Sequence, residues 1–260
     1  MWFIDDIERA GAVNMAIDDS LARKIGELDI QIAMRLYRWR GPTLSCGFHQ
    51  KLENRIDFVN CRQLGVKLAR RPTGGRELLH DGDLSFCIIA KANYESSEAV
   101  TKSRQFFFKV GQVIVGGLKT IGIKAEIETG SRKQESHDLS PCLVATSQYE
   151  IIADGKKLIP MAQRLYSDSI LVHGSIPIED SSVPTARLIK VKDAAKLQKV
   201  IDRTSTNLYQ LSGKEVDEDK LKTGLLKKFE EVFEDRADRL SFPETILAKV
   251  MQSVSNWEIR

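Results

Sequence analysis

The stretch of sequence that decides the fold reads Arg70-Arg71-Pro72-Thr73-Gly74-Gly75-Arg76-Glu77-Leu78-Leu79-His80-Asp81. It follows an apolar run, Val66–Ala69, that predicts a strand, so the glycine pair stands where the chain turns. Glycine lets backbone approach a ligand closely, and the N–H groups of such a turn suit a carbonyl oxygen or a phosphate. A Gly-Gly pair alone is typical of an ordinary surface turn. The flanking guanidinium groups favour a binding loop.

Helices and strands are interspersed around this loop at irregular spacing. Apolar periodicity predicts helices over Asn14–Glu27, Arg55–Leu64 and Ser103–Ile121, the first capped by Asn14 and the last ended by Gly122. Alternating apolar residues predict strands at Gln31–Tyr37 (half-buried), Val66–Ala69, Leu84–Ile88, Lys124–Glu128, Gln148–Ala153 and Ser169–Ile176. This order is too irregular for repeated β-α-β units and predicts an α+β domain, a mixed β-sheet flanked by helices.

The chain becomes helical and highly charged after about Asp193. Apolar residues keep helical spacing there, at Leu221, Leu225, Phe229, Val232 and Phe233. We therefore predict a catalytic domain over residues 1–192 and a small helical C-terminal appendage over residues 193–260. An extra layer of the same domain is an equally good interpretation of this segment.

Composition narrows the class of protein. The chain has 260 residues, 42% of them hydrophobic, which is enough for one large catalytic domain. A net charge of only +3 argues against nucleic-acid binding, and no apolar stretch is long enough for a membrane span. The start is apolar and then acidic, unlike a secretory signal, so we expect a cytoplasmic protein. The four cysteines are scattered, and no cluster has metal-ligand spacing, so we expect neither disulfides nor a bound metal.

Three further motifs accompany the Gly-Gly loop. The first is Asn14-Met15-Ala16-x-Asp18, in the predicted opening helix. The second is Ser140-Pro141-Cys142-Leu143-x-x-x-Ser147-x-Tyr149-Glu150. The third runs from Gly155-Lys156-Lys157 to Pro160-Met161-Ala162-Gln163-Arg164 and is followed by His173-Gly174-Ser175. Each motif taken alone has an ordinary structural explanation, because a turn lysine is usually solvated and a free cysteine is usually buried.

Together and in this order, the motifs resemble the lipoate-protein ligase and octanoyltransferase superfamily, which has the biotin/lipoate protein ligase-like fold. The resemblance covers residues 14–175. It is closest to the cysteine-dependent octanoyl-[acyl-carrier-protein]:protein octanoyltransferases, because Arg76 stands where the ATP-using ligases have Gly and Cys142 has the matching flank. The resemblance implies that Cys142 is the nucleophile and Lys157 the essential lysine. It also implies an acyl- and substrate-binding set: Arg71, Thr73, Gly74, Gly75, His80, Ala162, His173 and Gly174.

The sequence departs from the family at Pro160-Met161, where Gly-Ser is usual. Proline removes a backbone donor and methionine adds bulk, which weakens any interpretation that needs a complete adenylate site. A structural hydrogen-bonding role for His80 is as compatible with the sequence as a catalytic one. Cys46 and Cys61 are expected to be structural, and Cys87 lies inside a predicted apolar strand.

The resemblance implies octanoyl transfer from acyl carrier protein to a lysine of a lipoyl domain or H protein, through an acyl-Cys142 thioester and without a cofactor. One alternative is an ATP- and Mg²⁺-dependent lipoate-protein ligase, which forms a lipoyl adenylate. Others are an octanoyl amidotransferase between lipoyl proteins and a non-catalytic binder of lipoyl domains. Biotin ligation is disfavoured because the usual Gly-Arg-Gly-Arg string is missing.

Overall fold

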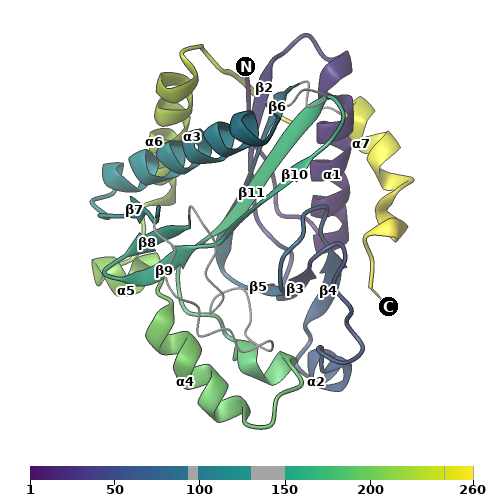
Figure 1. The fold of residues 1–260 in the computed structure, drawn as a ribbon, viewed down its shortest axis with the longest axis vertical. Helices are drawn as coiled ribbons and strands as arrows, with labels where there is room; N and C mark the ends of the chain where they lie inside the picture. The colour runs from purple at the N-terminus through teal and green to yellow at the C-terminus, as the bar shows by residue number, and fades with distance from the viewer. Residues whose placement is uncertain (93–98, 130–149, 243, 260) are drawn as a thin grey trace.

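The computed structural model describes residues 1–92, 99–129, 150–242 and 244–259. Six strands form its largest sheet: β1 (Trp2–Asp5), β2 (Ile32–Tyr37), β6 (Asp83–Lys91), β10 (Met161–Leu165), β11 (Ser169–Pro177) and β12 (Asp238–Leu240). Their order across the sheet is β10-β11-β6-β2-β1-β12 (Figure 1). The sheet is mixed, since β1 runs parallel to β2 and β12 while β6 runs antiparallel to β2 and β11.

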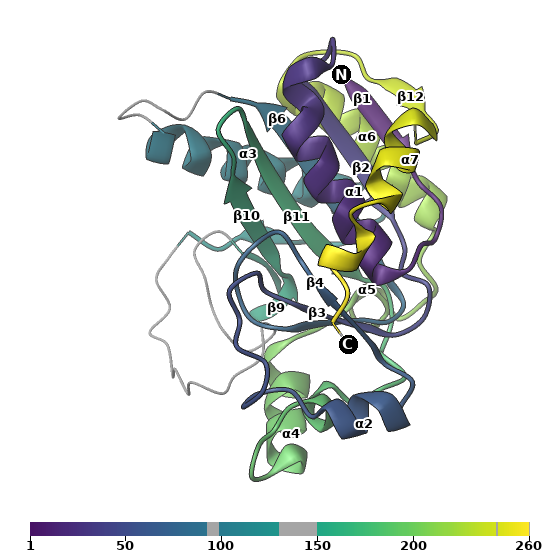
Figure 2. The same ribbon diagram turned by 90° about the vertical axis from the view of Figure 1, so that its right-hand side faces the viewer.

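Helices cover both faces of this sheet. One face carries α1 (Gly11–Lys24) and α7 (Glu244–Met251), and the other carries α3 (Ala99–Thr120) and α6 (Glu218–Phe233). The turned view in Figure 2 shows α7 lying beside α1, on the near side of the sheet. These layers confirm the predicted α+β class with a mixed sheet flanked by helices. Among the described residues, no helix is both long and apolar enough to cross a membrane.

The prediction that β2 is half-buried was wrong. Every residue of β2 is buried, because successive side chains point to opposite faces and both faces are covered. Met34 and Leu36 pack in the core beneath α3, whereas Ala33 and Tyr37 pack against α1. The apparent alternation came from two polar residues. Gln31 lies just outside the strand, and Arg35 lies inside it with its buried charge paired.

Two small sheets flank the large one. The first has the order β4-β3-β5, formed by β3 (Thr43–Cys46), β4 (Lys67–Arg70) and β5 (Leu78–His80), with α2 (Phe58–Gln63) between β3 and β4 in the chain. The second has the order β7-β8-β9, formed by β7 (Glu126–Ile127), β8 (Ile151–Ala153) and β9 (Lys156–Ile159). The first sheet places the Gly-Gly loop between β4 and β5, and the second carries Lys157.

The opening helix does not begin at Asn14. It begins at Gly11, after an Ala10 cap that has no side-chain hydrogen bond, so the predicted Asn14 cap was wrong. Asn14 is instead fully buried inside the first turns. Its amide nitrogen donates to the Arg38 carbonyl at 2.9 Å, and its amide oxygen accepts from the Arg35 guanidinium at 2.7 Å. Asn14 therefore joins α1 to the sheet.

The segment after Asp193 contributes α4 (Ala194–Thr204), α5 (Leu208–Ser212), α6, β12 and α7. Helix α6 packs along α3, and α7 packs on α1. Strand β12 was not predicted; it pairs in parallel with β1, at the edge of the main sheet. The segment therefore adds to the helical layers on both faces of the sheet. That residues 193–260 form an appendage separate from the catalytic domain stays a prediction.

Candidate active site

The Gly-Gly loop is held together by Arg71. The Arg71 side chain is buried, and its Nη2 donates to the carbonyls of Gly74 at 2.7 Å and Arg76 at 2.6 Å. Its Nη1 donates to the Ser45 carbonyl at 3.1 Å, which ties the loop to β3. Gly75 has a φ of 90°, a conformation that suits glycine. Arg71 therefore shapes the loop by binding its carbonyl groups.

His173 on β11 is hydrogen-bonded to the loop. Its Nε2 lies 2.7 Å from Oγ1 of Thr73, and its Nδ1 lies 3.5 Å from Oδ2 of Asp18 on α1. Burial lowers the pKa of His173 despite the nearby Asp18 carboxylate, so the ring is neutral at neutral pH. Three predicted motifs, the opening helix, the loop and the His-Gly-Ser strand, meet at this imidazole.

His80 lies in a second buried network. Its Nε2 lies 2.9 Å from Oγ of Ser45, and its Nδ1 lies 2.9 Å from Oδ2 of Asp83. The imidazole stacks on Trp39 with 3.8 Å between ring centroids. Burial acts to raise the pKa of Asp83, but the interactions with His80 and with the hydroxyls of Ser175 and Ser85 outweigh it and lower the pKa. These contacts hold the end of β5, where His80 lies, against the start of β6.

A narrow pocket of about 30 Å³, here called the acyl slot, lies between these networks. Most of its wall is apolar, and five of the predicted site residues contribute to it: Arg71, His80, Ala162, His173 and Gly174. The rest of the wall is Met15, Tyr37, Trp39, Ser45, Leu78, Ser85, Pro160 and Met161. A larger residue has no room at position 174, since a Cβ there would lie 2.6 Å from the Phe86 ring and 2.8 Å from the Pro160 carbonyl oxygen. The slot suits the narrow end of an aliphatic chain.

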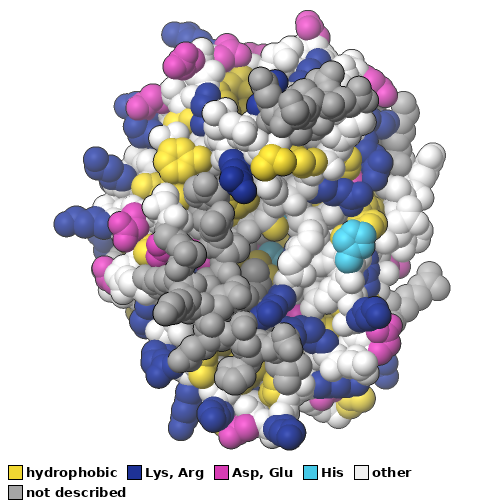
Figure 3. Space-filling view, viewed as in Figure 1, with side chains coloured by type: hydrophobic (Ala, Val, Ile, Leu, Met, Phe, Trp, Pro, Cys, Tyr) yellow, Lys and Arg dark blue, Asp and Glu magenta, His cyan; other side chains and the backbone are white. Residues whose placement is uncertain are grey.

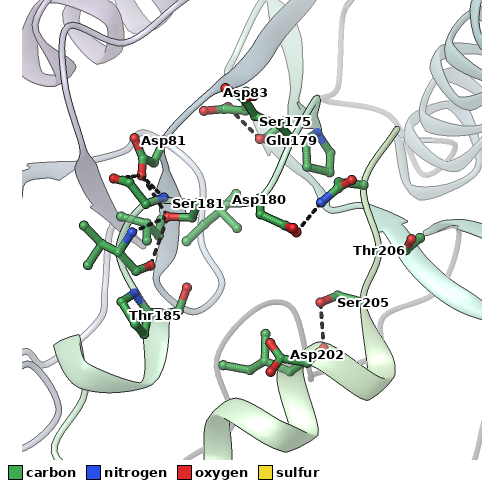
Figure 4. Close-up of a pocket in the computed structure, with 18 of the residues that line it drawn as sticks. Asp81, Asp83, Ser175, Glu179, Asp180, Ser181, Thr185, Asp202, Ser205 and Thr206 are labelled. Atoms are coloured by element: carbon green, nitrogen blue, oxygen red, sulfur yellow. Dashed lines mark hydrogen bonds between the residues drawn. The ribbon is translucent and has the colours of Figure 1, made fainter. Parts of the chain in front are cut away.

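A larger cavity of about 430 Å³ lies next to the slot and shares Leu78 and Pro160 with it. Carboxylates surround this second space, and we call it the acidic cavity (Figure 4). They belong to Asp81, Asp83, Glu179, Asp180 and Asp202.

Lys157 lies on β9 and does not line the acyl slot. It is 5% exposed, and its Nζ lies 2.5 Å from Oε1 of Glu150, which is equally buried. The neighbouring Lys156 has its Nζ at the surface, 3.3 Å from the Asp202 carbonyl. The alternation expected from strand geometry is present, with Lys157 directed inward and Lys156 outward.

Cys142, the predicted nucleophile, lies outside the described residues. The three cysteines that are described, Cys46, Cys61 and Cys87, are free and buried. Burial raises the pKa of Cys46 to about 12 and that of Cys61 to about 11, and it raises the pKa of Cys87 as well. Since the thiolate is the nucleophile, these three side chains are poorly suited to catalysis at neutral pH.

Comparison with known proteins identifies the family. Residues 10–230 match the lipoyl protein ligase A/B catalytic domain. The chain belongs to this family. Its curated relatives include the octanoyltransferase LipM of Carboxydothermus hydrogenoformans, 34% identical over 89% of this chain and 86% of the relative. The octanoyltransferase LipM of Geobacillus kaustophilus is 32% identical over 88% of this chain and 85% of the relative.

Solved structures of the family have the same fold. Lipoate-protein ligase A bound with ATP superimposes with a TM-score of 0.76 at 18% identity, covering 98% of this chain and 94% of that protein. A bipartite lipoate protein ligase from Thermoplasma acidophilum gives a TM-score of 0.76 at 18% identity, over 98% of this chain and 93% of that one. At such identity the likeness concerns the fold, and it confirms the predicted biotin/lipoate ligase-like architecture.

Sequence reasoning missed two buried carboxylates, Glu150 and Asp18, that form hydrogen bonds with other residues of the site. Glu150 was part of a quoted motif but was given no role, although it pairs with Lys157. Asp18 was also quoted; it accepts hydrogen bonds from Arg35 at 2.7 Å and from the Tyr37 hydroxyl at 2.9 Å. The signal that could have found them is a carboxylate within a motif of otherwise apolar or small residues, since buried carboxylates need partners.

Proposed function

We propose that this chain transfers an octanoyl group from acyl carrier protein to a lysine of a lipoyl domain or H protein. The observation that carries the proposal is the acyl slot, built from the family's motifs in a chain up to 34% identical to octanoyltransferases LipM. Burying an aliphatic chain contributes about 0.8 kcal/mol per methylene, so each methylene that enters the slot would favour binding of the acyl group.

The reaction runs through a thioester of Cys142. The Cys142 thiolate attacks the thioester carbonyl of the octanoyl donor, and the carrier thiol leaves. The acceptor amine then attacks the new thioester, an amide forms, and Cys142 leaves as a thiol. The ammonium group of Lys157 would favour the thiolate and the oxyanion of each tetrahedral intermediate. Neither step consumes a nucleotide, so we propose that no cofactor is required.

The charge pattern supports a carrier protein as the donor. On the face shown in Figure 3, Lys and Arg side chains reach the middle of the surface, while most Asp and Glu side chains lie towards its edge. A basic face of this kind favours encounter with an acidic carrier domain.

An ATP-dependent ligase is the second candidate, because a structural neighbour is a lipoate-protein ligase bound with ATP. Mg²⁺ and ATP would then be needed. The departure from the family at Pro160-Met161 speaks against this alternative, because the proline lacks a backbone donor that a complete adenylate site would need.

One assay separates the candidates. Octanoyl-carrier protein without ATP should add one octanoyl group to the intact enzyme, detected by mass, and then acylate a lipoyl domain. Cys142→Ala should abolish both steps. Free octanoate or lipoate with ATP and Mg²⁺ should give little product. Dominant ATP-driven acylation that survives Cys142→Ser would establish the ligase instead, and an octanoylated lipoyl protein acting as a better donor would establish the amidotransferase. A chain that binds lipoyl domains without any transfer would be a binder only.

A further inference from the structure

The C-terminal residues bind the strand that leads into the Gly-Gly loop. Strand β4 is an outer strand of its small sheet, with β3 along one edge. Along the other edge, Ala69 forms an antiparallel bridge with Glu258, and the backbone N–H of Arg70 donates to the Trp257 carbonyl at 2.8 Å. Arg70 is the last residue of β4, so the C-terminal segment holds the backbone where the loop begins.

The Trp257 side chain fixes this segment in the core. It is 6% exposed and lies in a hydrophobic cluster with Ala69 of β4 and with Ala12 and Ala16 of α1. The helical turn before it, η3 (Val254–Asn256), packs on α1. Figure 2 shows the C-terminal segment running along α1 to the level of β3 and β4.

Trp257 also reaches the Gly-Gly loop through the turn that follows β3. Its ring pairs with that of Phe48, with 6.4 Å between centroids. The Phe48 backbone N–H donates to the Thr73 carbonyl at 2.9 Å. Gly47 has no room for a Cβ, because the Gly75 carbonyl lies directly against it. The turn therefore lies between Trp257 and the loop.

Two arginines fasten this turn and the loop to each other. Arg70 Nη1 donates to three backbone carbonyls within residues 47–50, at 2.8–3.2 Å. Arg164 on β10 places its guanidinium 4.6 Å from the centroid of the Phe48 ring and donates to the Pro72 carbonyl at 2.8 Å. The Phe48 ring is thus in contact with Arg164 as well as Trp257.

We propose that Trp257 is a positioning residue of the acyl-transfer site, which acts through Phe48 on the Gly-Gly loop. Thr73 of this loop is hydrogen-bonded to His173 in the wall of the acyl slot, so a shift of the loop alters the slot. A displacement of about 1 Å at reacting groups can cost roughly 100-fold in rate. Trp257 itself does not line the slot. The inference rests on the proposed function for the reaction that is measured.

The first experiment compares Trp257→Ala with Trp257→Phe. In single-turnover loading from octanoyl-carrier protein, Trp257→Ala should lower the maximal rate about 10- to 100-fold. The half-saturating donor concentration should change little, because a buried residue does not touch the carrier. Trp257→Phe should stay within about threefold of the wild type, since a phenyl ring can still pair with Phe48. Hydrogen exchange read by mass spectrometry should be faster over residues 70–77 in Trp257→Ala.

The matched control is Trp2→Ala. Trp2 is also an indole packed against the cluster beneath α1, but it lies on β1 near the N-terminus, at the opposite end of the molecule from β4 in Figure 1. Its loss should leave the maximal loading rate and the exchange of residues 70–77 as in the wild type. Equal effects of Trp2→Ala and Trp257→Ala would reduce Trp257 to a general stabilising role and overturn the proposal.

Phe48→Ala tests the intermediate contact and keeps the proposal testable if Trp257→Ala does not fold. Phe48 is 37% exposed, so folding should tolerate its loss. The variant should also slow loading, and combining it with Trp257→Ala should add little, because both remove the same contact. A wild-type rate in Phe48→Ala, or losses that multiply, would contradict the proposal. If the wild type forms no acyl-cysteine, the proposed function fails, and unchanged hydrogen exchange in Trp257→Ala would separately refute the positioning role.

Discussion

Replacing Lys157 by methionine would leave the Glu150 carboxylate without the ammonium that now lies 2.5 Å away. Each of the two side chains is 6% exposed, so water replaces the lost ammonium poorly. Removing one member of a buried pair costs about 3–5 kcal/mol, whereas replacing both members by neutral groups is often close to neutral. We expect Lys157→Met to lower the unfolding free energy by about 3 kcal/mol, and Lys157→Met/Glu150→Gln to recover most of that loss.

Activity should follow a different pattern from stability. If the Lys157 cation stabilises the thiolate and the oxyanion, both variants should lose about 10²–10³-fold in octanoyl transfer, because one oxyanion donor contributes about that much. Urea denaturation gives the free energy of unfolding, and a single-turnover assay with octanoyl-carrier protein gives the rate. The matched control is Lys156→Ala, since this neighbouring ammonium is directed to the surface and should affect neither quantity.

Recovery of both stability and activity in the double variant would refute the reasoning. It would mean that the pair has only a structural role and that Lys157 takes no part in the chemistry. If Lys156→Ala also slowed octanoyl transfer, the opposite directions of the two lysine side chains on β9 would not explain which of them takes part in the reaction.

Two further predictions concern β11. Because burial lowers the pKa of His173 below its ordinary 6.5, the folded state binds fewer protons than the unfolded chain, so stability should fall as the pH drops through 6.5. His173→Gln should weaken this dependence in urea titrations at pH 7.5 and 5.5; an identical pH dependence would contradict the assignment. Gly174→Ala should cost about 1–3 kcal/mol and impair acyl binding, because its Cβ would lie 2.8 Å from the Pro160 carbonyl. Gly74→Ala is the control, because a Cβ at position 74 would meet no atom within 4 Å, and thermal stability should be unchanged. If both variants lost the same stability, the close contact at position 174 would not be the cause.

The sequence predicted helices and strands most accurately where an element has a regular apolar pattern of its own. The long helix predicted at Ser103–Ile121 is present as Ala99–Thr120, and the strand predicted at Ser169–Ile176 is present as Ser169–Pro177. Strand β9 was not predicted, although Asp154-Gly155 precedes it. Both residues have positive φ, as a type I′ hairpin turn requires, so this pair was a readable signal that was overlooked.

Other features could not be read from local pattern. Strand β12 has three residues, Asp238–Leu240, of which two are exposed, and only its pairing with β1 makes it a strand. Asn14 has the residue type of a helix cap, but buried partners on the sheet hold it inside the helix. For the candidate site, the sequence motifs predicted residues that the fold brings together around the acyl slot. The acidic cavity was missed because its carboxylates come from β5–β6, β11 and α4, which only the fold brings together.

The pairing of β1 with β12 has a consequence for synthesis. Strand β1, at residues 2–5, is synthesised long before its neighbour at the sheet edge, residues 238–240. At about 5–20 residues per second, the nascent chain waits roughly 10–50 s for this partner. During that time β1 presents an open strand edge, which can pair with other chains. Shortening the C-terminal segment would remove β12 and leave this edge open in the finished protein as well, so aggregation through β1 is the expected reason for poor yield of such variants.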